Sequence, residues 1–559
     1  MTLPPESGPP RPDEISAGAS FDVVLHGGSV VDGSGALSFR ADLGIRGDRI
    51  AAIGDLGQSE AAARVDVSGL VVAPGFIDLL GQSEFSVLVD NRAASKITQG
   101  ITTEISGEGT SIWPANERMI QAVLPWFHHF GVEPDWRSFA EFFRRLDERT
   151  RPAINIGLFV GAGSLRNYAL GLEGRPASAA ELELMKSLTA QAMEEGAMGV
   201  SSSLQYAPDR FASTEELTGL AAVSARHGGV YFTHQRSEGD RIFESLEEVF
   251  TIAEQAKSPV EIWHLKAAYR SNWGRMPEVL ARIEAARARG LDVTADMYPY
   301  DRSANSLDAC LPLWVREGGF EAMAGRLKNS DLRARIKAEM DNPSAIEWEN
   351  QWAGAGGGEG VLLVSVLDPA AKAFEGLSLA ELGSRQGRDP RDVLMDLVMT
   401  NRLTSCVLSI MNEEDVRAAL RHPLVSFCSD SQAMAGDGPL SKTKSHPRAW
   451  GSFPRILGRY VRQEKLLTLE EAVRKMTSQA ARRVGLADRG LLRPGMMADI
   501  AVFDPRNIRD EATFGDPNQY SRGIQYVFVN GRIVLSEKGL TDERPGRSLR
   551  GPGWRGPRP

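Results

Sequence analysis

The chain has 559 residues, of which 42% are hydrophobic and 25% are charged, as in globular proteins large enough for a catalytic domain and a smaller one. Its formal net charge of -9 gives no basic surface for a nucleic acid, and no apolar run is long enough to span a bilayer. The three cysteines, Cys310, Cys406 and Cys428, are far apart and indicate no disulfide framework.

The two ends of the chain share a β-rich pattern. Residues 1–20 form a Pro-rich arm without the basic and apolar segments of a signal peptide, so we expect a disordered arm and favour a cytoplasmic location. Residues 21–72 alternate apolar residues with Gly and Asp turns, which is typical of short strands. Residues 488–540 show the same pattern. We therefore predict one small β-sandwich domain built from both segments.

The middle of the chain has a different pattern. Residues 73–487 repeat a short apolar strand followed, in most cases, by an amphipathic helix. Eight such units predict an α/β fold of the (β/α)8 TIM-barrel type, and the alternative, a doubly wound sheet, gives no reason for eight units in succession. Residues of about 310–420 interrupt the pattern before the last strand, and we expect an inserted subdomain beside the barrel mouth. The Pro-, Gly- and Arg-rich tail, residues 541–559, is expected to wrap the surface or to be disordered.

Catalytic residues of such barrels lie at the carboxyl ends of the strands. The polar residues at these ends are, in chain order, Gln82, Glu108, Tyr206, His234, His264, Lys266, Tyr298 and Asp430. Imidazoles from neighbouring strands can meet at one metal ion, and zinc accepts nitrogen ligands. Zinc lowers the pKa of a bound water to about 7, and Asp430 could take the proton of that water. The alternative is that each histidine only satisfies a local hydrogen bond.

Longer segments carry a likeness to a known family. They are VVAPGFID, GITTEISG, EGAMGVSSSLQYAP, STEEL, GGVYFTHQRSE, PVEIWHLK, DVTADMYPY, HPRAWGSFPRILGRYV, EEAVRKMTSQAARRVGL and GMMADIAVFDP. With these segments the chain resembles the amidohydrolase superfamily, and within it the N-acyl-D-amino-acid deacylases (D-aminoacylases), over nearly its whole length. The resemblance implies a β-sandwich and a metal-bearing (β/α)8 barrel. It also implies hydrolysis of the amide bond of N-acylated D-amino acids by a zinc-activated water.

The resemblance assigns roles to single residues. The zinc-binding histidines of the family match His234 and His264, and its catalytic aspartate matches Asp430. The positions that hold the substrate carboxylate and the scissile carbonyl in the family are matched by Tyr206, Lys266, Tyr298 and Arg448. Such roles suit these residue types, because Lys and Arg pair with carboxylates and a Tyr hydroxyl can donate to a developing oxyanion.

Three positions depart from the family pattern. Leu80 and Gln82 replace the HxH pair after the first strand, the strand-2 segment is GEG and lacks the cysteine, and Ala162 replaces the strand-3 histidine. Gln82 is predicted to contact the substrate, or else to pack within its loop. Glu108 stands at or beside the position of the lost cysteine.

A carboxylate oxygen is an acceptable zinc ligand. We therefore predict one zinc ion (Zn2+) bound by Glu108, His234 and His264, the alternative being that Glu108 is a turn carboxylate bonded to backbone amides. The predicted function is zinc-dependent hydrolysis of the amide bond of an N-acylated amino acid or a related small amide, with Asp430 as general base and acid.

Two other functions stay open at this point. The same enzyme class could act on a cyclic amide or imide, or run amide synthesis. A metal-free relative could bind an acylated ligand without turning it over, although the retention of Asp430 beside two histidines argues against this. The expected partner is a small amide substrate, with no nucleic acid and no membrane, and the sequence leaves a homo-oligomer open.

Overall fold

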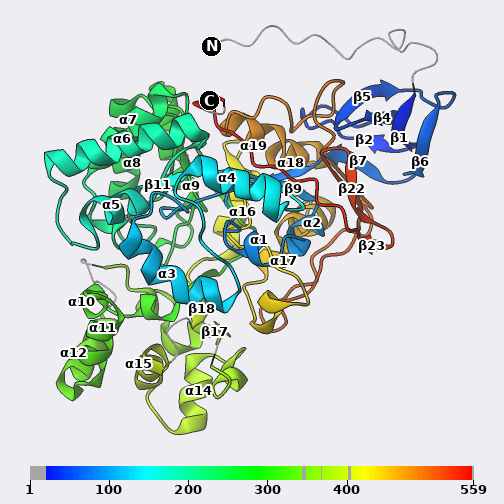
Figure 1. The fold of residues 1–559 in the computed structure, drawn as a ribbon. Helices are drawn as coiled ribbons and strands as arrows, with labels where there is room; N and C mark the ends of the chain where they lie inside the picture. The colour runs from blue at the N-terminus through cyan, green and yellow to red at the C-terminus, as the bar shows by residue number, and fades with distance from the viewer. Residues whose placement is uncertain (1–19, 343–347, 367, 401–403, 557–559) are drawn as a thin grey trace.

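The structure is a computed structural model that describes residues 20–342, 348–366, 368–400 and 404–556 (Figure 1). The predicted disordered arm, apart from Ser20, lies outside the described residues. Among the helices of the described ranges, none is long and apolar enough to cross a membrane.

Strands from both ends of the chain lie together at one side of the molecule (Figure 1). A four-stranded sheet has the order β5-β4-β1-β6, with β1 (Phe21–His26), β4 (Asp42–Arg46), β5 (Arg49–Gly54) and β6 (Ala61–Asp66). A seven-stranded sheet has the order β23-β22-β21-β20-β7-β2-β3, with β2 (Ser29–Val30), β3 (Phe39–Arg40), β7 (Val71–Pro74), β20 (Ile500–Phe503), β21 (Ile524–Val529), β22 (Arg532–Ser536) and β23 (Gly539–Leu540). Aliphatic side chains of both sheets, such as Leu25 and Ile500, form one buried cluster, so the sheets share a core.

A run of parallel strands forms the middle of the molecule. These strands are β8 (Phe76–Asp78), β9 (Ile101–Ser106), β10 (Asn155–Leu158), β11 (Val160–Gly161), β12 (Gly199–Ser203), β13 (Val230–His234), β14 (Val260–Ile262), β15 (Val293–Met297) and β19 (Val425–Phe427). They pair in the orders β10-β9-β8 and β11-β12-β13-β14-β15-β19, and only Phe159 separates β10 from β11. A parallel bridge between Gly81 and Ser431 links the ends of β8 and β19. This order is consistent with the predicted (β/α)8 barrel.

Helices cover the parallel strands, which are almost entirely buried, as strands with two covered faces must be. The helices outside the insertion are α1 (Ser86–Val89), α2 (Ala94–Ile97), α3 (Glu117–His129), α4 (Phe139–Arg145), α5 (Ala162–Leu170), α6 (Ala179–Glu195), α7 (Thr214–Arg226), α8 (Ile242–Ala256), α9 (Met276–Ala288), α16 (Glu413–Arg421), α17 (Arg448–Arg455), α18 (Leu469–Met476) and α19 (Ser478–Arg483). The Ser213 hydroxyl accepts a hydrogen bond from the Glu216 amide and starts α7.

A separate lobe lies between β15 and β19 (Figure 1). Its antiparallel sheet has the order β16-β18-β17, with β16 (Ser303–Ser306), β17 (Val361–Ser365) and β18 (Ser405–Leu408). Its helices are α10 (Leu313–Arg316), α11 (Gly319–Lys328), α12 (Ser330–Met340), α13 (Gln351–Gly354), α14 (Leu379–Gln386) and α15 (Pro390–Thr400). Helix α16 follows this lobe and packs against α9 and β19. All three cysteines are buried free thiols, in agreement with the sequence.

The described part of the C-terminal tail follows the surface of the barrel. The Ile156 amide donates to the Arg547 carbonyl over 2.9 Å, and the Leu549 amide donates to the Ile156 carbonyl over 2.7 Å. The Gly551 amide donates to the Gly196 carbonyl over 2.8 Å. The tail is thus attached to β10 and to the end of α6.

Candidate active site

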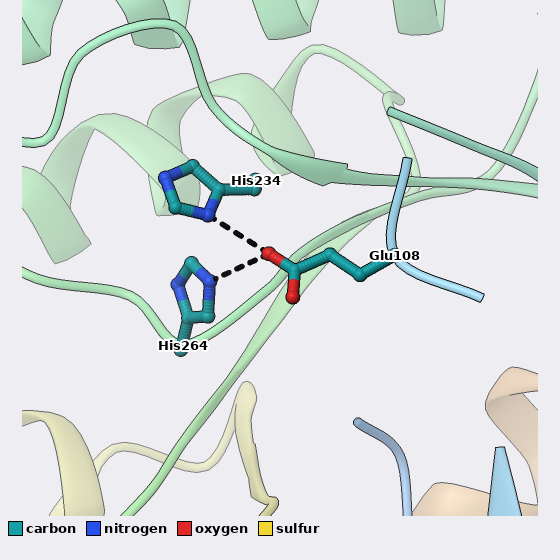
Figure 2. A group of neighbouring side chains, drawn as sticks. All are labelled: Glu108, His234 and His264. Carbon is teal, nitrogen blue, oxygen red and sulfur yellow. Dashed lines mark hydrogen bonds and ion pairs between the residues drawn. The ribbon is translucent and has the colours of Figure 1, made fainter. Parts of the chain in front are cut away.

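Three predicted metal ligands meet at the carboxyl ends of their strands (Figure 2). Glu108 lies in the turn after β9, His234 is the last residue of β13, and His264 follows β14. One carboxylate oxygen of Glu108, Oε1, lies 2.8 Å from His234 Nδ1 and 3.2 Å from His264 Nε2. Because β13 and β14 are paired neighbours, the two imidazole rings lie only 4.4 Å apart between centroids.

The donor set of these three residues fits a zinc ion. Their ligand atoms all lie within 4.8 Å of one another, and no other group of three or more His, Cys, Asp or Glu residues in the described ranges does so. Two ligands of a tetrahedral zinc, each at roughly 2.0 Å, stand about 3.3 Å apart, close to the separations of Glu108 from the two histidines. Two imidazole nitrogens and a carboxylate oxygen are ordinary zinc donors.

The charged side chains of this group shift one another's pKa values. Burial alone would raise the pKa of Glu108, but hydrogen bonds and charge from His234 and His264 hold it well below its usual range. Burial and the charge of Lys266 would lower the pKa of His264, yet the carboxylates of Glu238 and Glu108 raise it to about 10. Without a metal, the two carboxylates favour the imidazolium form of His264, whereas Lys266 Nζ, 2.6 Å from its Nδ1, opposes it.

A second group lies beside the first. Asp430 follows β19, and its Oδ2 lies 2.6 Å from Arg448 Nη1, at the start of α17. Gln82 follows β8, and its Nε2 donates to Asp430 Oδ1 over 2.8 Å and to Glu108 Oε2 over 3.0 Å. Gln82 thus connects the predicted general base to the predicted metal ligand.

Two site residues have unusual backbone conformations. His264 has φ +35° and Asp430 has φ +47°, in the left-handed region that non-glycine residues rarely adopt. The His264 amide donates to the buried Asp296 carboxylate over 2.7 Å, and the Asp430 amide donates to the Leu80 carbonyl over 2.8 Å. Strain held in place by the surrounding structure is typical of functional positions.

Glu238 belongs to the site although sequence reasoning missed it. Its Oε1 lies 3.0 Å from His264 Nδ1 and 2.7 Å from Lys266 Nζ, and its side chain is buried. A carboxylate that contacts the second nitrogen of a metal-binding imidazole orients that ring. The sequence HQRSE could have indicated Glu238, because it places a carboxylate four residues after the strand-end His234.

The site opens into a cavity of about 470 Å³. Its wall includes all nine predicted site residues: Gln82, Glu108, Tyr206, His234, His264, Lys266, Tyr298, Asp430 and Arg448. The lobe between β15 and β19 contributes a further part of the wall, with Asn305 of β16 and Gln351 of α13. Asn305 Nδ2 donates to the Tyr206 hydroxyl over 2.9 Å and to Gln351 Oε1 over 3.2 Å. Sequence reasoning assigned neither Asn305 nor Gln351 to the site.

The buried ring of Tyr298 lies close to two cationic side chains. The Arg448 guanidinium lies 4.6 Å from the centre of the Tyr298 ring, and Lys266 Nζ lies 5.5 Å from it. The Tyr298 hydroxyl contacts Met411 Sδ at 3.7 Å. Cation–π attraction to this ring favours the observed positions of both side chains, and all three residues line the cavity.

Comparison with known proteins decides the family. A protein-family model described as "Amidohydrolase family" matches residues 64–535 of the sequence. The chain belongs to the amidohydrolase family. As an amidohydrolase, it acts on C–N bonds other than peptide bonds.

Curated relatives of this amidohydrolase match along almost its whole length. It is 36% identical to a D-aminoacylase of Alcaligenes xylosoxydans xylosoxydans over 533 residues, covering 95% of this chain and 97% of that protein. It is also 36% identical to an N-acyl-D-glutamate deacylase of the same organism over 537 residues, covering 95% and 96%.

Solved structures agree with these matches. An N-acyl-D-glutamate deacylase from Bordetella bronchiseptica, complexed with zinc and a phosphonate mimic of the tetrahedral intermediate, has a TM-score of 0.78, 33% identity, and coverage of 95% of this amidohydrolase and 100% of that chain. A D-aminoacylase described as having a binuclear metal centre, with one-metal activation and second-metal attenuation, has the same TM-score at 34% identity, with coverage of 95% and 100%.

Proposed function

We propose that this amidohydrolase removes the acyl group from N-acylated D-amino acids, with one zinc ion held by Glu108, His234 and His264 and with Asp430 as general base and acid. The observation that carries the proposal is the contact of one Glu108 oxygen with both imidazoles in the wall of the cavity. The identity to a D-aminoacylase and an N-acyl-D-glutamate deacylase supports the substrate class.

The proposal includes the architecture that positions this site. We infer a (β/α)8 barrel over residues 73–487 and a small β-sandwich from residues 21–72 and 488–540. The parallel strand order, the bridge between Gly81 and Ser431, and the core shared by the two terminal sheets support this layout.

A zinc ion at this site would polarise the amide carbonyl and lower the pKa of a water to about 7. We assign to Asp430 the proton of the attacking water; its position on the cavity wall, linked to Glu108 through Gln82, supports this role. The same carboxylate then delivers that proton to the leaving nitrogen as the C–N bond breaks. The products are the carboxylate of the acyl group and a free amino acid.

The α-carboxylate of the substrate has suitable partners on one wall of the cavity. Arg448 and Lys266 both face the Tyr298 ring there. Lys266 Nζ already donates to Glu238 Oε1, His264 Nδ1 and the His264 carbonyl. Arg448 is therefore the better placed of the two to bind the carboxylate. Arg448 is buried, and within the described ranges its Nε has no hydrogen-bond acceptor. A buried guanidinium N–H without an acceptor is costly, and a substrate carboxylate would satisfy it.

Tyr206 is suited to donate to the developing oxyanion. Its hydroxyl oxygen accepts a hydrogen bond from Asn305, so its own proton is available for another acceptor. Burial, together with the charges of Glu108 and Glu238, raises the pKa of Tyr206 far above its usual value, so the hydroxyl stays protonated. Its ring stands 5.2 Å from that of His234, beside the predicted metal ligands.

The test combines metal analysis with a substrate panel. We expect about one zinc per chain and release of free amino acid from N-acetyl D-amino acids in preference to their L enantiomers. Asp430→Asn should retain zinc and lose about 100-fold or more in kcat. Glu108→Ala should lose zinc, whereas Glu133→Ala, an exposed carboxylate control, should keep both zinc and activity.

Two results would overturn this function. A wild-type protein that binds N-acyl amino acids without zinc and without turnover would be a binding relative. Glu108→Ala protein with unchanged zinc content would remove Glu108 from the ligand set.

A further inference from the structure

The backbone fixes Gln82 between three strand ends. The Gly81 amide donates to the Ile105 carbonyl over 2.9 Å, and the Gln82 amide donates to the Ser431 carbonyl over 3.2 Å. The next amide, that of Ser83, donates to the buried Glu104 carboxylate over 2.9 Å. These bonds join the end of β8 to β9 and β19, so the Gln82 side chain enters the cavity at one defined place.

The Gln82 carboxamide donates from a single nitrogen to two different carboxylates. Its Nε2 lies 3.0 Å from Glu108 Oε2 and 2.8 Å from Asp430 Oδ1, which uses both N–H groups of a primary amide. The other oxygen of Glu108 faces the two histidines, and the other oxygen of Asp430 faces Arg448. Each carboxylate is therefore held on both sides, with Gln82 as their shared neighbour.

A cation bound to Glu108 Oε2 and Asp430 Oδ1 would compete with Gln82 for both oxygens. A metal ion bound there would have to displace both Gln82 N–H groups and would gain no ligand from Leu80, which is apolar and buried. Within the described ranges, Asp430 belongs to no group of three His, Cys, Asp or Glu residues that could hold a second ion.

We propose that Gln82 is a positioning residue that fixes the Asp430 carboxylate to the Glu108 carboxylate and excludes a second metal ion from the space between them. The proposal rests on the proposed function, since it assigns Glu108 and Asp430 their roles there. In this view Gln82 acts on the carboxylates, and it contributes little to substrate affinity.

The test compares Gln82→Ala and the isosteric Gln82→Glu with wild type. Both variants lose the two donated hydrogen bonds, and both leave negative carboxylates facing one another. We expect kcat to fall at least about tenfold while KM changes less than twofold, because a mispositioned base affects the transition state and not substrate binding. Gln58→Ala, an exposed glutamine in the turn after β5, should match wild type in every measurement.

Metal stoichiometry gives a readout that does not depend on activity. Apoprotein dialysed against excess zinc, then freed of loose ions and analysed for zinc, should retain about one ion per wild-type chain. Gln82→Glu should retain close to two, because it replaces both N–H donors with a third carboxylate beside Glu108 and Asp430. Gln82→Ala supplies no ligand and should retain fewer ions than Gln82→Glu.

Two results would overturn the proposal. A Gln82→Ala enzyme with normal kcat and a raised KM would make Gln82 a substrate contact. One zinc in wild type and in both variants would remove the exclusion role. A wild-type protein that binds zinc but hydrolyses no N-acyl amino acid would defeat the proposed function alone, because the stoichiometry of the variants would still decide the role of Gln82.

Discussion

At the scale of single residues, His264 couples zinc binding to the release of a proton. Its pKa of about 10 means that the metal-free protein carries an imidazolium at neutral pH, while a zinc ligand must be neutral. Zinc uptake should therefore release at least about one proton per ion at pH 7, and acidification should weaken binding about tenfold per pH unit.

Calorimetric titration with zinc in two buffers of different ionisation enthalpy measures this release directly. The two apparent heats should differ by the difference between the ionisation enthalpies of the buffers multiplied by the number of protons released. Equal heats in both buffers would mean that His264 is already neutral in the metal-free protein.

Glu238 provides a second prediction at this scale. Its carboxylate contacts His264 Nδ1 and Lys266 Nζ, and Gln at this position keeps the shape but loses the charge. We expect Glu238→Gln to weaken zinc binding by about 10- to 100-fold, as measured by competition with a chelator. Glu244→Gln, an exposed position at the start of α8, is the matched control. An unchanged zinc affinity in Glu238→Gln would contradict the orienting role.

The predicted ligands and the missed residues differ in where they sit on their elements. Glu108, His234 and His264 lie at the carboxyl ends of buried strands or two residues beyond them, so the geometry of parallel strands brings them to one edge. Glu238 and Asn305 reach the site only because a loop and the lobe after β15 fold back over the barrel. Such contacts depend on tertiary packing, which a local sequence pattern does not predict.

At the scale of elements, the end of β8 depends on a residue without a side chain. A Cβ on Gly81 would lie 1.9 Å from Glu104 Cδ, and Glu104 cannot yield easily because it is buried against Lys96 at 2.9 Å. Gly81→Ala should therefore lower the free energy of unfolding by about 1–3 kcal/mol and reduce activity through Gln82.

Urea unfolding of the purified variants checks this prediction. Gly325→Ala, in the exposed middle of α11 with open space around it, should instead stabilise the protein by about 1 kcal/mol. A Gly81→Ala protein as stable as wild type would show that Glu104 moves without cost.

The strands were easier to predict than the limits of the lobe between them. The parallel strands are buried on both faces, and β-branched or aromatic residues mark several of them in the sequence, as in VYFTH of β13. The sheet of the lobe starts with β16, whose sequence SANS is polar and only partly buried, and it looks like a loop by composition. The predicted start at about residue 310 therefore falls after this strand.

At the scale of the whole molecule, the C-terminal tail is bonded to β10, a barrel strand that lies far earlier in the chain. Backbone bonds from Arg547 and Leu549 to Ile156, and burial of the Leu549 side chain, would be lost if residues 545–559 were removed. We expect this truncation to destabilise the protein by at least about 2 kcal/mol.

Thermal unfolding of two truncated proteins measures the effect. Removal of residues 557–559 alone leaves all these contacts in place and should leave the melting temperature unchanged. If both truncated proteins melt like wild type, the tail contributes nothing to stability.

The seven-stranded sheet has a consequence for the order of events during protein synthesis. Strand β7 leaves the ribosome early, but its antiparallel neighbour β20 is made only after the entire barrel segment has emerged. Until then β7 has one unpaired edge, and the apolar side chains that cover Ile500 and Phe528 in the finished protein stay partly open to solvent. The nascent chain must therefore carry an incomplete sheet through most of its translation, and this is the interval in which we expect it to need protection by chaperones.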